Sequence, residues 1–185
     1  MKSKAWQHHA SIILLILSVG INVVLVKRLH ALTHVDTGLQ SGERVHALDV
    51  TSLDGRPVRI AFTGDLPTVL YYFSPTCAWC ERNWDNVRAL AAGAPGRYQL
   101  IGLSTSAEIG EFMQKRGLAF DVYSGVSDEA VRTYHLNGTP QTVVVSGKGT
   151  VIRAWPGAYT PDATREIERQ FGLSLPGIRA AAHQP

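Results

Sequence analysis

The chain of 185 residues contains only two cysteines, Cys77 and Cys80, and two residues separate them. Thiols at this spacing can form a disulfide with each other or bind a soft metal ion. The preceding run Thr68–Phe73 is β-branched and aromatic throughout, which is typical of a buried strand. The apolar residues that follow recur every three or four positions, which predicts a helix. The sequence therefore places the cysteine pair between a buried strand and the first turn of a helix.

This position gives the two thiols different chemistry. At a helix N-terminus, unpaired backbone N–H groups and the helix dipole stabilise a thiolate, so we expect Cys77 to be nucleophilic near neutral pH. Cys80 belongs to the apolar stripe of the helix and is expected to be shielded from water. The pair predicts catalytic thiol–disulfide exchange, in which Cys77 attacks the disulfide of another protein and Cys80 resolves the mixed disulfide.

Metal binding is the alternative use of such a pair. A structural zinc site needs four ligands, and the chain has no second cysteine pair. The adjacent His8 and His9 precede an apolar segment. His135 is expected at the C-terminal end of a helix, where a cation is favourable, and this explains it without a metal ion. We therefore predict no metal ion and no cofactor.

Composition excludes few classes of protein, but it argues against a nucleic-acid partner. The net charge is +3, and Lys and Arg are scattered along the chain. Binding to nucleic acid requires basic side chains gathered on one face. An apolar content of 45% is normal for a globular domain.

The N-terminal segment is predicted to anchor the chain in a membrane. Residues 10–26 are almost entirely apolar, and basic residues flank them on both sides. A span of this length lies at the short end of the roughly 17–25 residues that cross a bilayer. A cleaved signal peptide is the alternative. We predict a transmembrane helix within residues 1–28, a flexible linker over 29–44, a folded domain over 45–173 and a loose tail over 174–185.

Alternating strand and helix patterns predict an α/β fold for the domain. A turn sequence between the first two strands indicates a hairpin. The order of the later elements predicts a central mixed sheet covered by helices on both faces. The expected strands are Val45–Ser52, Val58–Phe62, Thr68–Phe73, Gln99–Ser104, Phe120–Tyr123, Gln141–Ser146 and Thr150–Trp155, and the expected helices after the one at the cysteines are Ala107–Arg116, Ser127–His135 and Pro161–Phe171.

A second motif, Gly138-Thr139-Pro140, follows the cysteines by about 60 residues and precedes a strand. A strand, Cys-x-x-Cys, a helix and a later Gly-Thr-Pro before two strands resemble the thioredoxin superfamily. The hairpin and the membrane tether are similar to the TlpA-like group of bacterial periplasmic thiol–disulfide oxidoreductases. The resemblance covers Val45–Phe171.

The resemblance implies roles for residues outside the cysteine pair. It implies that Pro140 is cis and packs beside the cysteines, and that the backbone of Thr139 binds an extended substrate segment. Trp79, between the cysteines, is expected either to contact a partner protein or to pack over the motif. The resemblance further implies a single-pass protein of the inner (cytoplasmic) membrane with its catalytic domain in the periplasm. Its partners would be protein thiols and disulfides, with a membrane electron donor or acceptor.

The sequence also departs from that family. The family often places an acidic residue near the second cysteine to accept its proton, and the matching positions here are the neutral Tyr71 and Asn83. A proline common in the following helix is replaced by Asp85, and Glu81 is expected to point to solvent. The proton acceptor for Cys80 is therefore not identified.

Two other functions remain open at this point. A peroxiredoxin would carry Pro and Thr before its reactive cysteine, where this chain has Leu70 and Ser74. A copper-binding chaperone of the same fold would use the two thiolates to hold Cu(I), but related domains space their cysteines by three residues.

Overall fold

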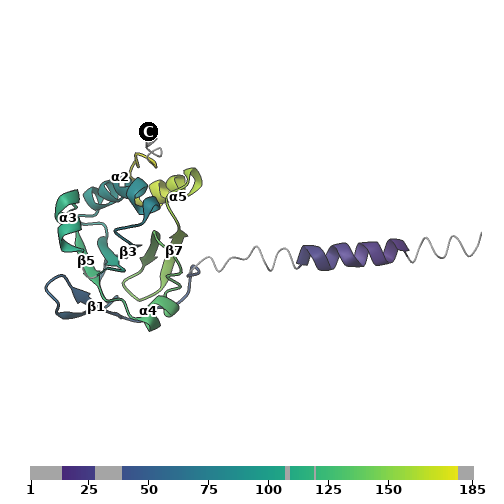
Figure 1. Cartoon of the computed structure of the whole chain (residues 1–185), viewed down its shortest axis with the longest axis horizontal. Coiled ribbons are helices and arrows are strands. Elements are labelled where there is room, and N and C mark those ends of the chain that lie inside the picture. Colours follow the sequence, from purple (N-terminus) through teal and green to yellow (C-terminus); the bar gives the residue numbers. More distant parts are fainter. Residues whose placement is uncertain (1–13, 28–38, 107–108, 119, 179–185) are drawn as a thin grey trace, which may run out of the picture. The chain divides into compact units, whose positions relative to one another are not determined.

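The structure is a computed structural model that describes residues 14–27, 39–106, 109–118 and 120–178. The chain divides into two units, Met1–Asp36 and Thr37–Pro185. In the first unit, residues 14–27 form a helix with exposed apolar side chains (Figure 1). The rest of the predicted anchor lies outside the described residues. Among the residues described, no helix has both the length and the apolar character needed to cross a membrane. The predicted transmembrane helix stays a prediction.

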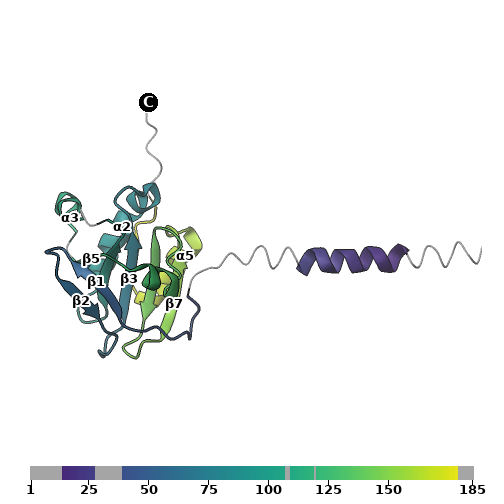
Figure 2. The ribbon, with the colours of Figure 1, turned by 60° about the horizontal axis from the view of Figure 1, so that its bottom comes forward.

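The second unit is built on one seven-stranded mixed sheet, in the order β2-β1-β5-β4-β3-β6-β7. Strands β3, β4 and β5 run parallel, and β6 pairs with β3 in the antiparallel sense. The predicted hairpin, β1 and β2, joins the sheet beside β5 (Figure 2). The strands are β1 (Leu48–Ser52), β2 (Pro57–Ile60), β3 (Thr68–Phe73), β4 (Gln99–Ser104), β5 (Asp121–Ser124), β6 (Gln141–Val145) and β7 (Val151–Pro156). The prediction of a mixed sheet with an early hairpin is confirmed.

Helices cover both faces of the sheet, as predicted. Helices α2 (Ala78–Gly93), α3 (Gly110–Arg116) and α5 (Pro161–Phe171) bury side chains in one core, and α4 (Asp128–Thr133) packs into the other. Figure 1 shows α4 on the opposite side of the sheet from α2 and α5. The predicted start of α3 at residues 107–108 lies outside the described residues. Ser127 caps α4 by accepting a hydrogen bond from the backbone N–H of Ala130 at 3.1 Å, as its sequence position indicates.

The central strand β3 divides its side chains between the two cores. Tyr71 and Phe73 belong to the core under α2, whereas Leu70 belongs to the opposite core. Trp84 of α2 packs edge-on against Phe73, with ring centroids 5.1 Å apart. Removing a buried indole side chain costs about 3–5 kcal/mol, so this contact is a main attachment of α2 to the sheet.

The domain extends beyond the boundaries predicted from the sequence. Residues 39–44, assigned there to the linker, lie along β7: Gly42 donates a backbone hydrogen bond to Val151 at 2.8 Å, and Val151 donates one to Glu43 at 2.8 Å. At the other end, Leu175 of the predicted loose tail is buried in the core under α2. Neither segment shows apolar periodicity in the sequence. Backbone hydrogen bonds hold residues 39–44, and one buried side chain, Leu175, holds the other segment.

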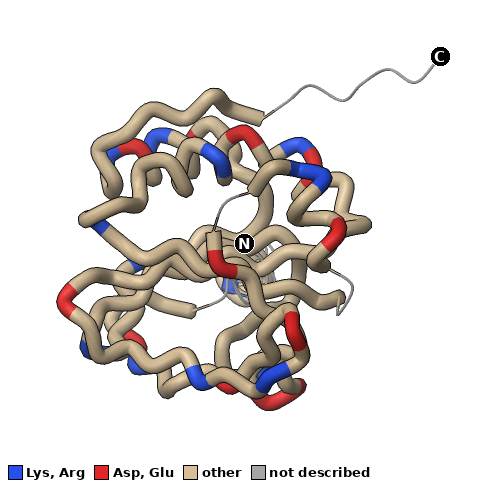
Figure 3. The backbone as a smooth tube through the Cα atoms, turned by 90° about the vertical axis from the view of Figure 1, so that its left-hand side faces the viewer, with Lys and Arg blue, Asp and Glu red and all other residues tan. Residues whose placement is uncertain are grey.

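Charged side chains are distributed over the domain surface. Lys and Arg are interspersed with Asp and Glu along the described backbone (Figure 3). Exposed pairs such as Arg59 with Asp49 contribute little to stability, typically about 0–1 kcal/mol. The buried polar residues of the described part are all uncharged: Thr68, Asn83, Asn86, Ser104, Ser124, Gln141 and Thr142. The apolar cores therefore hold the fold.

We expect Gly102→Ala to destabilise the domain, because Gly102 lies in β4 beside Tyr71 with no room for a side chain. A Cβ atom there would come within 2.8 Å of Val122 and 2.9 Å of Phe120. Overpacking of this kind lowers the free energy of unfolding by about 1–3 kcal/mol, which urea denaturation would measure. Gly110→Ala is the control because a Cβ atom there has no other atom within 4 Å. Equal stability of the two variants would contradict the packing argument.

Candidate functional site

Cys77 forms the N-cap of α2, at the end of the short loop that follows β3. Its backbone is extended, with φ −82° and ψ 114°, and its sulfur accepts a hydrogen bond from the backbone N–H of Cys80 at 3.2 Å. The backbone N–H of Cys77 donates to the carbonyl of Ser74 at 3.2 Å, which closes the loop. The sulfur thus occupies the place that a Ser or Asp oxygen takes in an ordinary helix cap.

The two sulfurs have opposite surroundings, as the sequence predicts. Burial alone would raise the pKa of Cys77, but hydrogen bonds to its sulfur from Cys80, from the Thr139 side chain and from the backbone of Trp79 lower that pKa below the usual value. Cys80 is only 1% exposed, and burial raises its pKa to about 12. Both cysteines are free thiols. The lowered pKa of the outer sulfur favours its thiolate, and the raised pKa of the inner sulfur favours its thiol.

The second sequence motif lies against Cys77. The Thr139–Pro140 peptide bond is cis, as the resemblance implies. The Cys77 thiol donates to the carbonyl oxygen of Thr139, with sulfur and oxygen 3.3 Å apart. Pro140 is buried and Gly138 is exposed, so the chain emerges at the surface beside the sulfur. The fold brings together two segments that are 62 residues apart along the chain.

Trp79 lies exposed between the two cysteines. Its side chain is 53% exposed, and the guanidinium carbon of Arg82 lies 4.5 Å from the ring centroid. A cation over an indole face is attractive by about 0.5–1 kcal/mol at an exposed site, which holds the ring in place. Packing within the domain was one of the two expectations for Trp79, and it covers only part of the side-chain surface. The rest is exposed, and contact with a partner protein stays a prediction.

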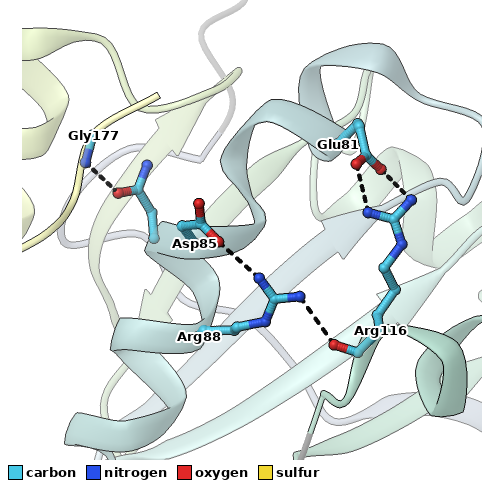
Figure 4. Close-up of polar contacts among 6 residues, drawn as sticks. Glu81, Asp85, Arg88, Arg116 and Gly177 are labelled. Atoms are coloured by element: carbon cyan, nitrogen blue, oxygen red, sulfur yellow. Dashed lines mark hydrogen bonds and ion pairs between the residues drawn. The ribbon is translucent and has the colours of Figure 1, made fainter. Parts of the chain in front are cut away.

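Helix α2 is tied to α3 by charged side chains just below the cysteine pair. Both carboxylate oxygens of Glu81 accept from the Arg116 guanidinium, and Arg88 donates to the carbonyl of Arg116 at 3.0 Å (Figure 4). Asp85, where the family has proline, pairs with Arg88 at 2.7 Å. The Glu81 side chain is 45% exposed, in line with the expectation that it points to solvent, but it is also paired with Arg116. Its partner lies 35 residues away along the chain, and no local sequence signal indicates it.

The neutral residues that replace the family's acidic group lie in the core beside the cysteines. Tyr71 and Asn83 are both fully buried, and the Asn83 amide donates to the Tyr71 hydroxyl at 3.4 Å. Burial raises the pKa of Tyr71 far above its usual value, so it remains neutral. The described part of the domain has no buried carboxylate to accept the Cys80 proton.

Over the described ranges, no three side chains of His, Cys, Asp and Glu gather closely enough to hold a metal ion. Cys77 and Cys80 alone supply two soft ligands. His135 follows α4 with a left-handed backbone, at φ 47°.

No family model matches the chain. It is 29% identical over 119 residues to the methylamine utilization protein MauD of Methylobacillus flagellatus, which covers 63% of this chain and 58% of that protein. The chain thus spans less than two thirds of this relative's length. It is 26% identical over 138 residues to the soluble secreted antigen MPT53 of Mycobacterium tuberculosis, which covers 73% of this chain and 77% of that protein.

Solved structures show the same fold. The thioredoxin domain of a thiol–disulfide oxidoreductase from Bacteroides vulgatus aligns with a TM-score of 0.58 and 15% identity, over 72% of this chain and 99% of that one. A secreted disulfide oxidoreductase of Mycobacterium tuberculosis, homologous to DsbE of E. coli, aligns with a TM-score of 0.54 and 23% identity. That match covers 67% of this chain and 93% of the other.

We expect iodoacetamide to modify Cys77 at least about tenfold faster than Cys80 in the reduced, folded protein at pH 7. The lowered pKa of Cys77 enlarges its thiolate fraction, whereas the raised pKa and burial of Cys80 suppress reaction there. Peptide mass mapping over time would measure both rates. In denaturant the two rates should converge, and faster modification of Cys80 in the folded protein would contradict the assignment.

The fold and the cysteine site are consistent with each other. A cysteine pair opens α2, a cis proline lies beside the outer sulfur, and the domain aligns with solved structures of disulfide oxidoreductases. The helices lie on both faces of the sheet, and the hairpin extends it. The domain therefore has a thioredoxin-like fold, and the solved structures that share this fold include thiol–disulfide oxidoreductases.

Proposed function

We propose that the chain is a thiol–disulfide oxidoreductase that exchanges disulfides with other proteins through Cys77 and Cys80. The observation that carries this proposal is the contrast between the two sulfurs on one turn of α2. Cys77 accepts hydrogen bonds that favour its thiolate, while Cys80 is shielded and protonated. A symmetric metal-binding pair has no need of this difference.

The exchange proceeds in two balanced steps. The Cys77 thiolate attacks one sulfur of the partner's disulfide, which forms a mixed disulfide and releases the partner's other sulfur as a thiolate. Cys80 then loses its proton to solvent or to that released thiolate, attacks Cys77, and releases the second partner sulfur. Two electrons pass to the partner, and Cys77 and Cys80 become a disulfide. The reverse sequence oxidises a partner dithiol.

Thr139, Pro140 and Trp79 are proposed to bind the partner segment. The Thr139 carbonyl already lies 3.3 Å from the Cys77 sulfur, so a chain held along residues 138–139 is close to the nucleophile. The exposed part of the Trp79 ring, two residues after Cys77, gives that chain an apolar surface close to the nucleophile in the sequence. Aromatic side chains of this kind often dominate the energetics of protein–protein contacts.

We also propose that the N-terminal segment holds the domain at the periplasmic side of the inner membrane, where a membrane-borne protein supplies or removes electrons. The apolar run of residues 10–26 and its flanking basic residues support this location. The relative MPT53, a soluble secreted antigen by name, supports a site of action outside the cytoplasm.

We expect Cys80→Ser to accumulate a mixed disulfide with partner proteins, because the resolving sulfur is absent and the first step is intact. Non-reducing electrophoresis of the full chain incubated with a disulfide-bonded protein such as insulin would show the adduct. Cys77→Ser is the matched control and should form at least about tenfold less adduct. Wild-type protein should instead form a reversible internal disulfide. Its absence, together with stoichiometric retention of Cu(I) by the reduced chain, would support the copper-binding alternative.

We expect Trp79→Ala to raise the KM for a protein disulfide substrate by about fivefold, with a smaller change in kcat, because it removes contact area and leaves the sulfurs in place. Insulin reduction at varied insulin concentration would measure both constants. Leu66→Ala is the control, since Leu66 is also exposed and apolar but lies in the loop before β3. An unchanged KM would remove Trp79 from the binding surface.

A further inference from the structure

A chain of hydrogen bonds runs through the core from the C-terminal segment toward the cysteine pair. The backbone N–H of Gly177 donates to Asn86 Oδ1 at 2.9 Å, a link drawn in Figure 4. Asn86 Nδ2 donates to Asn83 Oδ1 at 2.9 Å, and Asn83 Nδ2 donates to the Tyr71 hydroxyl oxygen at 3.4 Å. The three side chains are fully buried and uncharged.

Backbone groups fix the direction of this chain. A backbone N–H can only donate, so the amide oxygen of Asn86 must face Gly177. The backbone N–H of Tyr159 donates to Asn83 Oδ1 at 3.4 Å, which fixes the second amide in the same way. Each NH2 group therefore faces the next residue, and Tyr71 receives a hydrogen bond through its oxygen. The hydroxyl hydrogen of Tyr71 makes no hydrogen bond to any described residue.

Tyr71 lies in the same core as the resolving sulfur. Asn83, its partner, is three residues after Cys80 on α2, so both lie on the helix face that packs on β3. Burial raises the pKa of Tyr71 most, and the charges of Tyr159, Cys80 and Cys77 raise it further. Because Asn83 holds the Tyr71 hydroxyl, this hydroxyl lies about one helical turn from the position of Cys80 on α2.

We propose that the Tyr71 hydroxyl donates a hydrogen bond to the sulfur of Cys80 when that sulfur becomes negatively charged, and that Asn83 and Asn86 position the hydroxyl for it. This inference rests on the proposed thiol–disulfide exchange. In the resolving step Cys80 gives its proton to solvent or to the released partner thiolate, and its electron pair forms the bond to Cys77. Tyr71 keeps its proton and stabilises the attacking thiolate through a hydrogen bond, so it transfers neither a proton nor electrons.

Where the resembled family often has a buried carboxylate, this chain has a neutral hydrogen-bond donor, the hydroxyl of Tyr71. A thiolate in an apolar core is costly because no water compensates it, and a hydrogen bond to an ionised group is about twice as strong as one between neutral groups. Donors linked in one direction also polarise one another. A carboxylate at the position of Tyr71 or Asn83 would repel the thiolate once it was ionised, whereas the neutral chain favours it.

The test follows the two steps separately in the full chain, with mild detergent for the exposed apolar helix. Reduced protein mixed with dithiobis(nitrobenzoate) releases one coloured thiolate when Cys77 attacks and a second when Cys80 resolves the adduct. Stopped-flow absorbance therefore gives both rate constants in one experiment. Tyr71→Phe removes only the hydroxyl. Tyr72→Phe is the matched control, because the adjacent Tyr72 faces the opposite core.

We expect Tyr71→Phe to slow the second phase about tenfold, equivalent to about 1.4 kcal/mol, and to leave the first phase unchanged. Tyr72→Phe should leave both phases unchanged, and Asn86→Leu should slow the second phase by a smaller factor, about twofold to threefold. An unchanged second phase in Tyr71→Phe would overturn the inference. Equal slowing of both phases would also overturn it, since that indicates general disruption. A wild-type protein with no second phase would instead contradict the proposed exchange itself.

Discussion

The hydrogen bond from the backbone N–H of Cys80 to the sulfur of Cys77 is the interaction on which the site depends. It makes the sulfur the cap of α2, so the same contact begins the helix and favours the thiolate. The bond persists only if α2 is held firmly at the end of β3. Packing of Trp84 on Phe73 supplies that attachment, and it lies one helical turn below Cys80.

The two cysteines differ because one turn of helix carries the chain from the surface into the core. Cys77 is partly exposed and receives several donors, whereas Cys80 is surrounded by apolar side chains. Burial therefore keeps the inner sulfur as a thiol and shields it from solvent. The same burial makes its later ionisation costly, and the surrounding polar side chains are uncharged. In the proposed exchange, the selectivity between the two sulfurs and the difficulty of the resolving step have the same physical origin, which is the burial of Cys80.

Segments far apart in the sequence complete the surroundings of the pair. The chain before β6 brings the Thr139 carbonyl to Cys77, and α3 brings Arg116 to Glu81, directly after Cys80. The segment after α5 reaches back to Asn86 on the inner face of α2. Helix α2 is thus held on its inner and outer faces, and its N-terminal turn remains accessible. A rigid helix with an open first turn suits a reaction in which one sulfur stays in place while partners exchange.

Local sequence patterns were sufficient to predict most helices and strands and the position of the cysteine pair. The apolar run of β3, the periodicity of α2 and the cap at Ser127 follow from residue type and spacing, because neighbours along the chain satisfy them. The place of Pro140 came from family resemblance. Only the tertiary structure decided the pairing of Glu81 with Arg116, the docking of residues 39–44 on β7, and the direction of the chain from Gly177 to Tyr71. Each of these joins groups that no local spacing relates, and their geometry is set by how the helices pack on the sheet.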